Sequence, residues 1–221
     1  DYRLPIHHAA VRGHLDAVAA LVAAAPETVW ENDEYGCLPI HCAAAAGHLP
    51  VVAHLLAAAP DTVWAANNAW QQLPLHLAAK GGYADVVAAL LAVAPETVLA
   101  ESAGADNDLF GDEGGFLPLH LASGRGRVRV VEQLLAVAPA AARRPNGEGG
   151  LPLHYASASL GSTDEHVTVM RLLLEAAPDT AAAQGFFGQL PLGWAAHSVN
   201  QAGVEMLLAA APGTALVADP D

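Results

Sequence analysis

The sequence contains little cysteine, and this limits the covalent and metal-bound structures that it can form. Only two of its 221 residues are cysteines, Cys37 and Cys42. A disulfide between two residues five apart would close a single turn, so we expect two reduced thiols, as in proteins of the cytoplasm or the nucleus. A structural zinc site is not expected either, because no second cysteine pair exists to complete four ligands.

Positive charge is also scarce. The chain has nine Lys and Arg residues against 23 Asp and Glu, which gives a formal net charge of −14. Nucleic-acid binding requires a basic stripe, so we expect no nucleic-acid partner. Five of the nine lie close together in the fourth of the units defined below, and they either balance the acidic residues just before them or contact an anionic group or acidic peptide: Arg125, Arg127, Arg129, Arg143 and Arg144.

Long apolar runs and catalytic motifs are missing as well. No apolar stretch reaches the ~18 residues needed to cross a bilayer, because proline interrupts the alanine-rich segments, so we expect no membrane association. There is no nucleophile-elbow serine motif, no phosphate-binding glycine loop and no paired metal motif, so we expect neither catalysis nor a cofactor. The chain begins at Asp1 without a methionine and runs straight into a helix start, which we interpret as a piece of a longer protein.

What the sequence has instead is a short segment that recurs six times. Each copy places proline where it suits the first position of a helix. In four copies a glycine follows nine residues after the leading leucine, a second apolar helix comes next, and a second proline closes the unit. This repetition predicts an all-α repeat solenoid of helix-turn-helix units that forms a single domain over residues 1–221. The units start near Leu4, Leu38, Leu73, Leu117, Leu151 and Leu190.

The linkers between units carry a turn signature. Asp33-Glu34-Tyr35-Gly36 combines an acidic first residue with a fourth-position glycine, and similar tetrads follow the later units, among them Asn68-Ala69-Trp70-Gln71 and Asp112-Glu113-Gly114-Gly115. With extended residues such as Val29 and Trp30 on its flank, such a linker predicts a short hairpin-like finger. Two loops are longer than the rest, at 101–108 and 159–164, and we expect the acidic 101–108 insertion to be the most mobile internal segment.

The second unit shows which family the pattern resembles. Leu38-Pro39-Ile40-His41-Cys42-Ala43-Ala44, Gly47-His48, Val51-Val52 and Leu55-Leu56 are similar, in register, to the ankyrin repeat. The resemblance covers essentially the whole chain. It implies stacked helix pairs with projecting fingers, and a concave face of fingers and first helices that binds other proteins.

The sequence departs from the family pattern in two places. Leucine replaces the usual threonine before each Pro-Leu-His, and we expect burial of these leucines to compensate for the lost hydroxyl cap. Proline replaces glycine after the second helix, and we expect it to end that helix without a left-handed residue.

Histidine is common, and five of the eleven histidines follow the repeat: His7, His41, His76, His120 and His154. Stacked helices lie ~8–10 Å apart. Because zinc needs all its ligands within ~2.1 Å of one centre, one histidine per repeat cannot build a metal site. We therefore expect each imidazole to hydrogen-bond backbone near its own turn.

The candidate binding residues lie at the fingertips. Aromatic residues are common interface anchors, and four occur in the turns: Tyr35, Trp70, Phe186 and Phe187. The alternative is that these rings pack on a neighbouring finger. We expect Trp70 to be mostly exposed above a buried Leu73, whereas Trp30 and Trp64 should cover a second helix. Acidic candidates in the same turns are Asp33, Glu34, Asp112, Glu113 and Glu148.

The sequence thus favours a monomeric interaction module. Its partner would be another protein or a peptide segment, basic or neutral in charge, because the module itself is acidic. The alternative is a structural spacer array that positions other domains of a longer protein, one of them catalytic.

Overall fold

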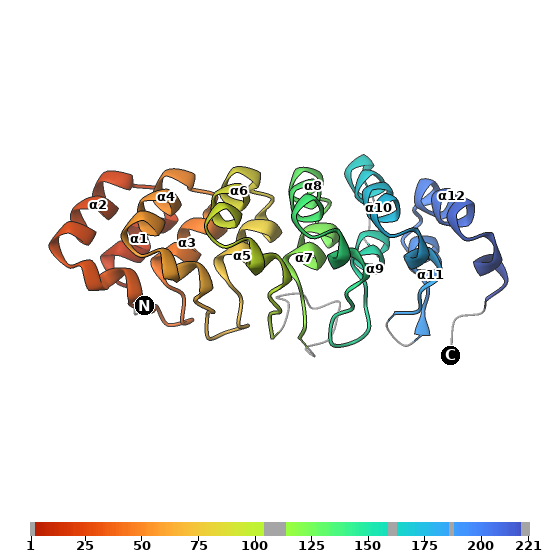
Figure 1. Cartoon of the computed structure of the whole chain (residues 1–221), viewed down its shortest axis with the longest axis horizontal. Coiled ribbons are helices and arrows are strands. Elements are labelled where there is room, and N and C mark those ends of the chain that lie inside the picture. The colour runs from red at the N-terminus through yellow and green to blue at the C-terminus, as the bar shows by residue number, and fades with distance from the viewer. Residues whose placement is uncertain (1–2, 104–113, 159–162, 186–187, 218–221) are drawn as a thin grey trace.

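The computed structural model describes residues 3–103, 114–158, 163–185 and 188–217. These residues form twelve α-helices in six pairs that follow one another along a single axis (Figure 1). The first helices of the pairs are α1 (Pro5–Val11), α3 (Pro39–Ala46), α5 (Pro74–Gly81), α7 (Pro118–Gly124), α9 (Pro152–Ser157) and α11 (Pro191–His197). The second helices are α2 (Leu15–Ala24), α4 (Leu49–Ala58), α6 (Ala84–Val93), α8 (Val128–Val137), α10 (Asp164–Ala176) and α12 (Gln201–Ala210).

Each first helix starts at the proline of the repeated segment, as the sequence predicts. The preceding leucine is the N-cap and is extended; Leu73, for example, has φ −76° and ψ 161°. Burial is confirmed for the five leucines that follow another repeat. These are at most 6% exposed: Leu38, Leu73, Leu117, Leu151 and Leu190. Leu4, at the open end of the stack, is 38% exposed. Each fully buried leucine side chain contributes ~2 kcal/mol, which offsets a lost cap of ~1 kcal/mol.

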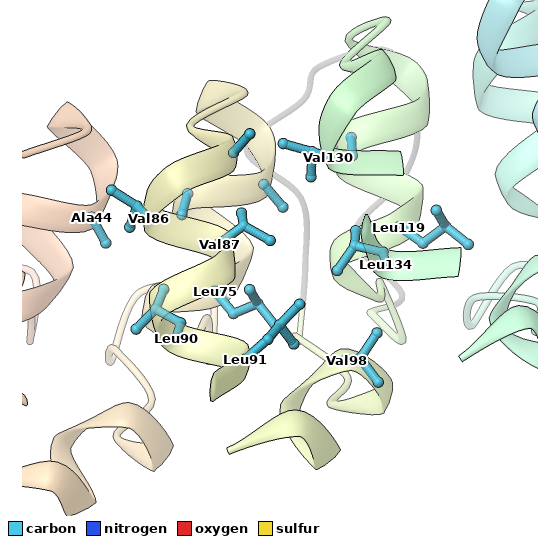
Figure 2. Close-up of a cluster of buried hydrophobic side chains, with 14 of the residues drawn as sticks. Ala44, Leu75, Val86, Val87, Leu90, Leu91, Val98, Leu119, Val130 and Leu134 are labelled. Atoms are coloured by element: carbon cyan, nitrogen blue, oxygen red, sulfur yellow. The ribbon is translucent and has the colours of Figure 1, made fainter. Parts of the chain in front are cut away.

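The core runs without interruption between the two helix layers. Figure 2 shows its middle, where Leu75 of α5 meets Val87 and Leu90 of α6, while Leu119 of α7 and Leu134 of α8 continue the core in the next repeat. All five side chains are essentially inaccessible to solvent. Alanines at the other inward positions let the helices approach closely, so each repeat buries its apolar face only against its neighbours.

The glycine between the two helices of a unit has the left-handed conformation that the sequence predicts. Gly47 and Gly82 have φ +77° and +85°, and the residue after the glycine of the following repeat covers each of them. A Cβ on Gly47 would lie 2.3 Å from the ring of Tyr83, so both the backbone and the neighbour require glycine. In the last repeat Val199 takes this position with φ +55°, an unfavourable conformation for a β-branched residue.

The prolines that close the units do more than end a helix. Each begins a short 3₁₀ helix, and these are η1 (Pro26–Trp30), η2 (Pro60–Trp64), η3 (Pro95–Leu99), η4 (Pro139–Arg143), η5 (Pro178–Ala182) and η7 (Pro212–Leu216). The prediction that Val29 and Trp30 are extended is therefore wrong. The cause is local, because the Thr28 hydroxyl donates to Ala25 O at 2.7 Å and stabilises the turn. As predicted, the residue before each proline is not left-handed; Ala25 has φ −147°.

The fingers begin seven residues after the first five of these prolines, and their described parts project to the same side of the helix stack (Figure 1). In the first finger Asp33 N donates to Cys37 O at 3.0 Å, and Asn67 N makes the same bond to Gln72 O. The tetrads predicted that the second turn starts at Asn68, but it starts at Asn67. It is therefore one residue longer than the first turn.

The third finger carries the long insertion inside its turn. Ser102 pairs with Phe116 in an antiparallel bridge, in the position that Asp33 and Cys37 occupy in the first finger. Gly115 N donates to Ser102 O as Gly36 N donates to Asp33 O, so Gly115 is the counterpart of Gly36, and Ser102 is that of Asp33. Asp112 and Glu113 of the expected tetrad lie outside the described residues. Most of the 101–108 segment, whose mobility was expected, lies outside the described residues.

Candidate functional site

The five repeat histidines connect each helix start to the next finger. Their Nδ1 atoms accept the N–H of their own N-cap leucine, as in Leu73 N to His76 Nδ1 at 3.1 Å. Their Nε2 atoms therefore carry the proton and donate to carbonyls beyond the following 3₁₀ helix; His76 donates to Ala100 O at 3.1 Å and to Phe116 O at 3.0 Å. The expected backbone bond near the histidine's own turn is confirmed, and the second bond, to the next repeat, was not predicted.

Burial keeps the imidazoles of His41, His76, His120 and His154 neutral. Desolvation lowers the pKa of His41, His76 and His154 to about 4 and that of His120 to about 3, although the carbonyls that accept from Nε2 oppose the shift. Both ring nitrogens of each histidine bond backbone, so these side chains act in the fold. In the described part of the chain, no three His, Cys, Asp or Glu side chains lie close enough together to hold a metal ion.

The first two finger turns are built on a side-chain cap. The Asp33 carboxylate accepts from Tyr35 N at 3.0 Å and from Cys37 N at 2.9 Å, and Arg3 Nε lies 3.2 Å from its other oxygen. Burial opposes ionisation of Asp33, but these donors outweigh it and hold its pKa below the usual range. Asn67 caps the second turn in the same way, through Trp70 N and Gln72 N. Asp33 is thus 7% exposed and fixes the position of Tyr35.

A hollow of about 480 Å³ opens on the concave face of the first three repeats. Tyr35 and Trp70 line it from the fingers, and small residues of α3, among them Cys42 and Ala45, line it from the helix layer together with Leu77 of α5. The guanidinium of Arg3 lies 5.9 Å from the centre of the Tyr35 ring and holds that ring at the rim. The hollow is therefore mostly apolar, with a few polar groups at the finger bases.

The same face is filled in the fourth and fifth repeats. Phe116, His120 and Tyr155 meet edge to face, with ring centres 5.4 to 6.0 Å apart, and Leu121 completes the cluster while Trp194 packs against it. Asn146 Nδ2 donates to the Tyr155 hydroxyl at 2.8 Å. Tyr155 occupies the place in its repeat that Cys42 has in the second repeat, and Phe116 occupies the place of Cys37 and Gln72. Larger side chains at these two positions together fill the face.

The structure brings only some of the predicted binding residues to one place. Tyr35 and Trp70 share the hollow, and each precedes a left-handed residue, Gly36 or Gln71, as their common place in the turn suggested. Trp70 is exposed, as expected, but only to 36%, because part of its ring lines the hollow, and Leu73 is buried as expected. Glu34 is exposed next to Tyr35, whereas Glu148 is half-buried in a distant finger. Phe186, Phe187, Asp112 and Glu113 lie outside the described residues.

The residues that line the hollow from the helices were missed by the sequence analysis. Cys42 and Leu77 directly follow the repeat histidine, at the most variable position in that part of the motif. Cys42 is 7% exposed, and burial raises the pKa of its thiol to about 12. Both cysteines are free, as expected.

The arginines of the fourth repeat have separate roles. Arg143 pairs with Asp179, Arg144 NH2 lies 2.8 Å from Glu101, and Arg127 Nε donates to Lys80 O of the preceding repeat. The Arg144–Glu101 pair supports the interpretation as charge balance with the acidic stretch. Arg125 and Arg129 are exposed. None of the described helices combines the length and the apolar character required to traverse a lipid bilayer.

Comparison with known proteins identifies the repeats. A family model described as "Ankyrin repeats (many copies)" matches residues 6–56, and one described as "Ankyrin repeat" matches residues 71–98 and 114–143. The chain is an ankyrin repeat protein. Ankyrin repeats generally act as non-catalytic modules of protein–protein interaction.

Solved structures extend the likeness to nearly the whole chain. The ankyrin repeat domain of human ASB11 is 25% identical and superposes with a TM-score of 0.74, over 95% of this chain and 84% of that one. A chain in the structure of the Bd0816 predatory endopeptidase from Bdellovibrio bacteriovorus in complex with immunity protein Bd3460 is 22% identical, with a TM-score of 0.72, over 94% of this chain and 98% of that one. The comparison with curated proteins found no match.

Proposed function

We propose that this ankyrin repeat protein binds a segment of another protein along the concave face of its first three repeats. The observation that supports this proposal most directly is the hollow between Tyr35 and Trp70 above Cys42 and Leu77. Its volume of about 480 Å³ accommodates one or two large side chains. Two aromatic residues held in place by capped turns provide contact area at a low cost in conformational entropy.

The charge of the chain favours a basic or neutral partner. The formal net charge is −14, and Glu34 is exposed next to Tyr35, which lines the hollow. An acidic surface of this kind accelerates encounter with cationic segments and makes binding sensitive to salt. The partner segment in this proposal inserts an apolar side chain into the hollow and carries basic residues beside it.

Two further facts agree with this proposal. The family to which the chain belongs generally mediates protein–protein interaction. One structural neighbour comes from a complex between an endopeptidase and an immunity protein. The likeness to that neighbour concerns the fold, so the partner of the present chain has to be identified by experiment.

The test compares partners captured from a cell extract by three proteins. The first is the unchanged chain, and the second carries Tyr35→Ala and Trp70→Ala. The third is a matched control with Val93→Ala and Val137→Ala, which removes two exposed apolar side chains of 46% and 44% exposure from the second helices. We expect partners held by the unchanged chain and by the control to be lost from the Tyr35/Trp70 variant.

Two outcomes contradict the proposal. Equal retention by all three proteins would show that the hollow is not the contact. Absence of any partner at low and at physiological salt would favour the spacer array, in which the repeats only position attached domains.

A further inference from the structure

A second surface runs along the 3₁₀ helices, whereas the hollow is lined by the fingers and the first helices. The last residue of η1, η2 and η3 is large, apolar and about half exposed: Trp30 (48%), Trp64 (49%) and Leu99 (43%). The expectation that the tryptophans cover a second helix thus accounts for only half of each side chain. Exposed tryptophans at equivalent positions of adjacent repeats form a row that the core does not require.

The fourth repeat shows what this row faces. There the last residue of the 3₁₀ helix is Arg143, and its guanidinium binds Asp179, the second residue of the next 3₁₀ helix. Arg143 Nε lies 2.9 and 3.0 Å from the two carboxylate oxygens, and NH1 donates to Ala176 O at 3.4 Å. The pair lowers the pKa of Asp179 below its usual value, chiefly through these hydrogen bonds. The protein itself therefore displays an arginine bound at this position.

Repeat geometry transfers this arrangement to the first three repeats. Every 3₁₀ helix from η1 to η5 contacts the second helix of the following repeat, so successive 3₁₀ helices pack in the same way along the stack, and we expect the arrangement of Arg143 and Asp179 to recur at the equivalent positions. The residue that faces Trp30 is then Asp61, and the one that faces Trp64 is Glu96. Both carboxylates are exposed, and neither forms an ion pair with another residue in the described ranges.

We propose that Trp30 with Asp61, and Trp64 with Glu96, are two binding positions for arginine side chains of a partner protein. A guanidinium that stacks on the indole can pair with the neighbouring carboxylate, as Arg143 pairs with Asp179, because arginine combines a flat face with a fork of donors. Adjacent repeats lie ~8–10 Å apart. Arginines three residues apart in a polyproline II segment, which has three residues per turn and rises ~3.1 Å per residue, project to the same side and match this spacing. This surface does not depend on the proposed function of the hollow.

The probe is a synthetic glycine/serine peptide with two arginines three residues apart, and the readout is the indole N–H signals of the four tryptophans in a nitrogen-15 NMR spectrum. We expect the arginine peptide to shift the signals of Trp30 and Trp64 and to leave those of Trp70 and Trp194 in place. A peptide with lysine in place of arginine should bind several-fold more weakly, because an ammonium group lacks the planar fork. Equal binding of the lysine peptide, or shifts at Trp70 alone, would overturn the proposal.

Two variants of the protein complete the test. Asp61→Asn with Glu96→Gln should weaken binding of the arginine peptide by roughly tenfold, as expected for the loss of two exposed ion pairs while both indoles remain. The matched control is Asp16→Asn with Asp85→Asn, which makes the same charge change at exposed positions on the first turns of α2 and α6. An equal loss in both variants would mean general charge attraction and would reject the assignment.

A third variant tests the internal analogy. Trp64→Arg reproduces the fourth repeat, so the new guanidinium should pair with Glu96 as Arg143 does with Asp179. We expect this variant to lose peptide binding at its own position while Trp30 still responds. If the total affinity for the peptide is undiminished in this variant, Trp64 and Glu96 take no part in binding.

Discussion

The concave face is open over repeats one to three and closed over repeats four and five, although both regions consist of the same kind of helix pair. At the position after the repeat histidine, the second repeat has Cys42 and the fifth has Tyr155. The tyrosine reaches Asn146 and Phe116 and completes a buried aromatic cluster, whereas the cysteine lies beside a hollow of about 480 Å³. Phe116, Leu121 and Tyr155 thus fill the face in the closed region, whereas the smaller Cys37 and Cys42 leave it hollow in the open region.

The largest expected effect is the loss of stability at low pH, because both the open and the closed region contain buried histidines. The pKa of His41, His76 and His154 is lowered to about 4 and that of His120 to about 3, against ~6.5 in an unfolded chain. The unfolded state therefore binds protons first, so stability falls as pH drops below ~6.5. Each histidine should cost about 2 kcal/mol at pH 5. Thermal melts between pH 7 and 4 measure this; a midpoint that stays constant down to pH 5 would contradict it.

A smaller effect should follow from opening the closed region. Tyr155→Cys gives the fifth repeat the residue of the second. The substitution leaves a cavity beside Phe116, and it removes the hydroxyl to which the Asn146 amide donates. We expect a loss of about 3 kcal/mol in the free energy of unfolding. Urea denaturation measures the loss, and Cys42→Ala, which removes little volume, is the control at the equivalent position. Equal losses in the two variants would show that the cluster adds no stability.

The reverse change should close the open region. Cys42→Tyr would direct a hydroxyl toward Asp33, which occupies the place of Asn146, and would fill the hollow between Tyr35 and Trp70. We expect the free energy of unfolding to change by less than ~1 kcal/mol, while partners captured through the hollow are lost. Capture from extract combined with a urea melt separates the two effects. Retention of the partner by a folded Cys42→Tyr protein would contradict the proposed site.

The smallest expected effect concerns the rim of the hollow. Gln71 has φ +52° where the first finger has Gly36, so its left-handed backbone is strained. Gln71→Gly should raise the free energy of unfolding by about 0.5 kcal/mol, because relief of that strain slightly exceeds the added entropy of the unfolded chain. A melt detects the change, and Gln71→Ala should not reproduce it. A loss of stability in the glycine variant would show that the Gln71 side chain contributes more than its backbone costs.

Features that depend on one unit alone could be predicted from the sequence. Proline at the helix start, glycine at Gly47 and burial of Leu73 follow from local rules of backbone conformation and hydrophobicity. Features that depend on the neighbouring repeat could not. The second hydrogen bond of His76 and the place of the insertion after Ser102 are set by pairing between segments that lie far apart in the sequence. The hollow escaped prediction for the same reason, because it forms between three repeats.

The cover that each repeat lays over its neighbour's glycine has a consequence for modularity. Tyr83 lies over Gly47, and Arg127 lies over Gly82, so the contact that closes each helical turn is supplied from the following unit. A single unit excised from the array would have a glycine that no following side chain covers, and a side chain after that glycine that has lost the glycine of the preceding unit as its contact. The smallest portable building block of this protein is therefore a pair of consecutive repeats, and duplication or transplantation should respect that boundary.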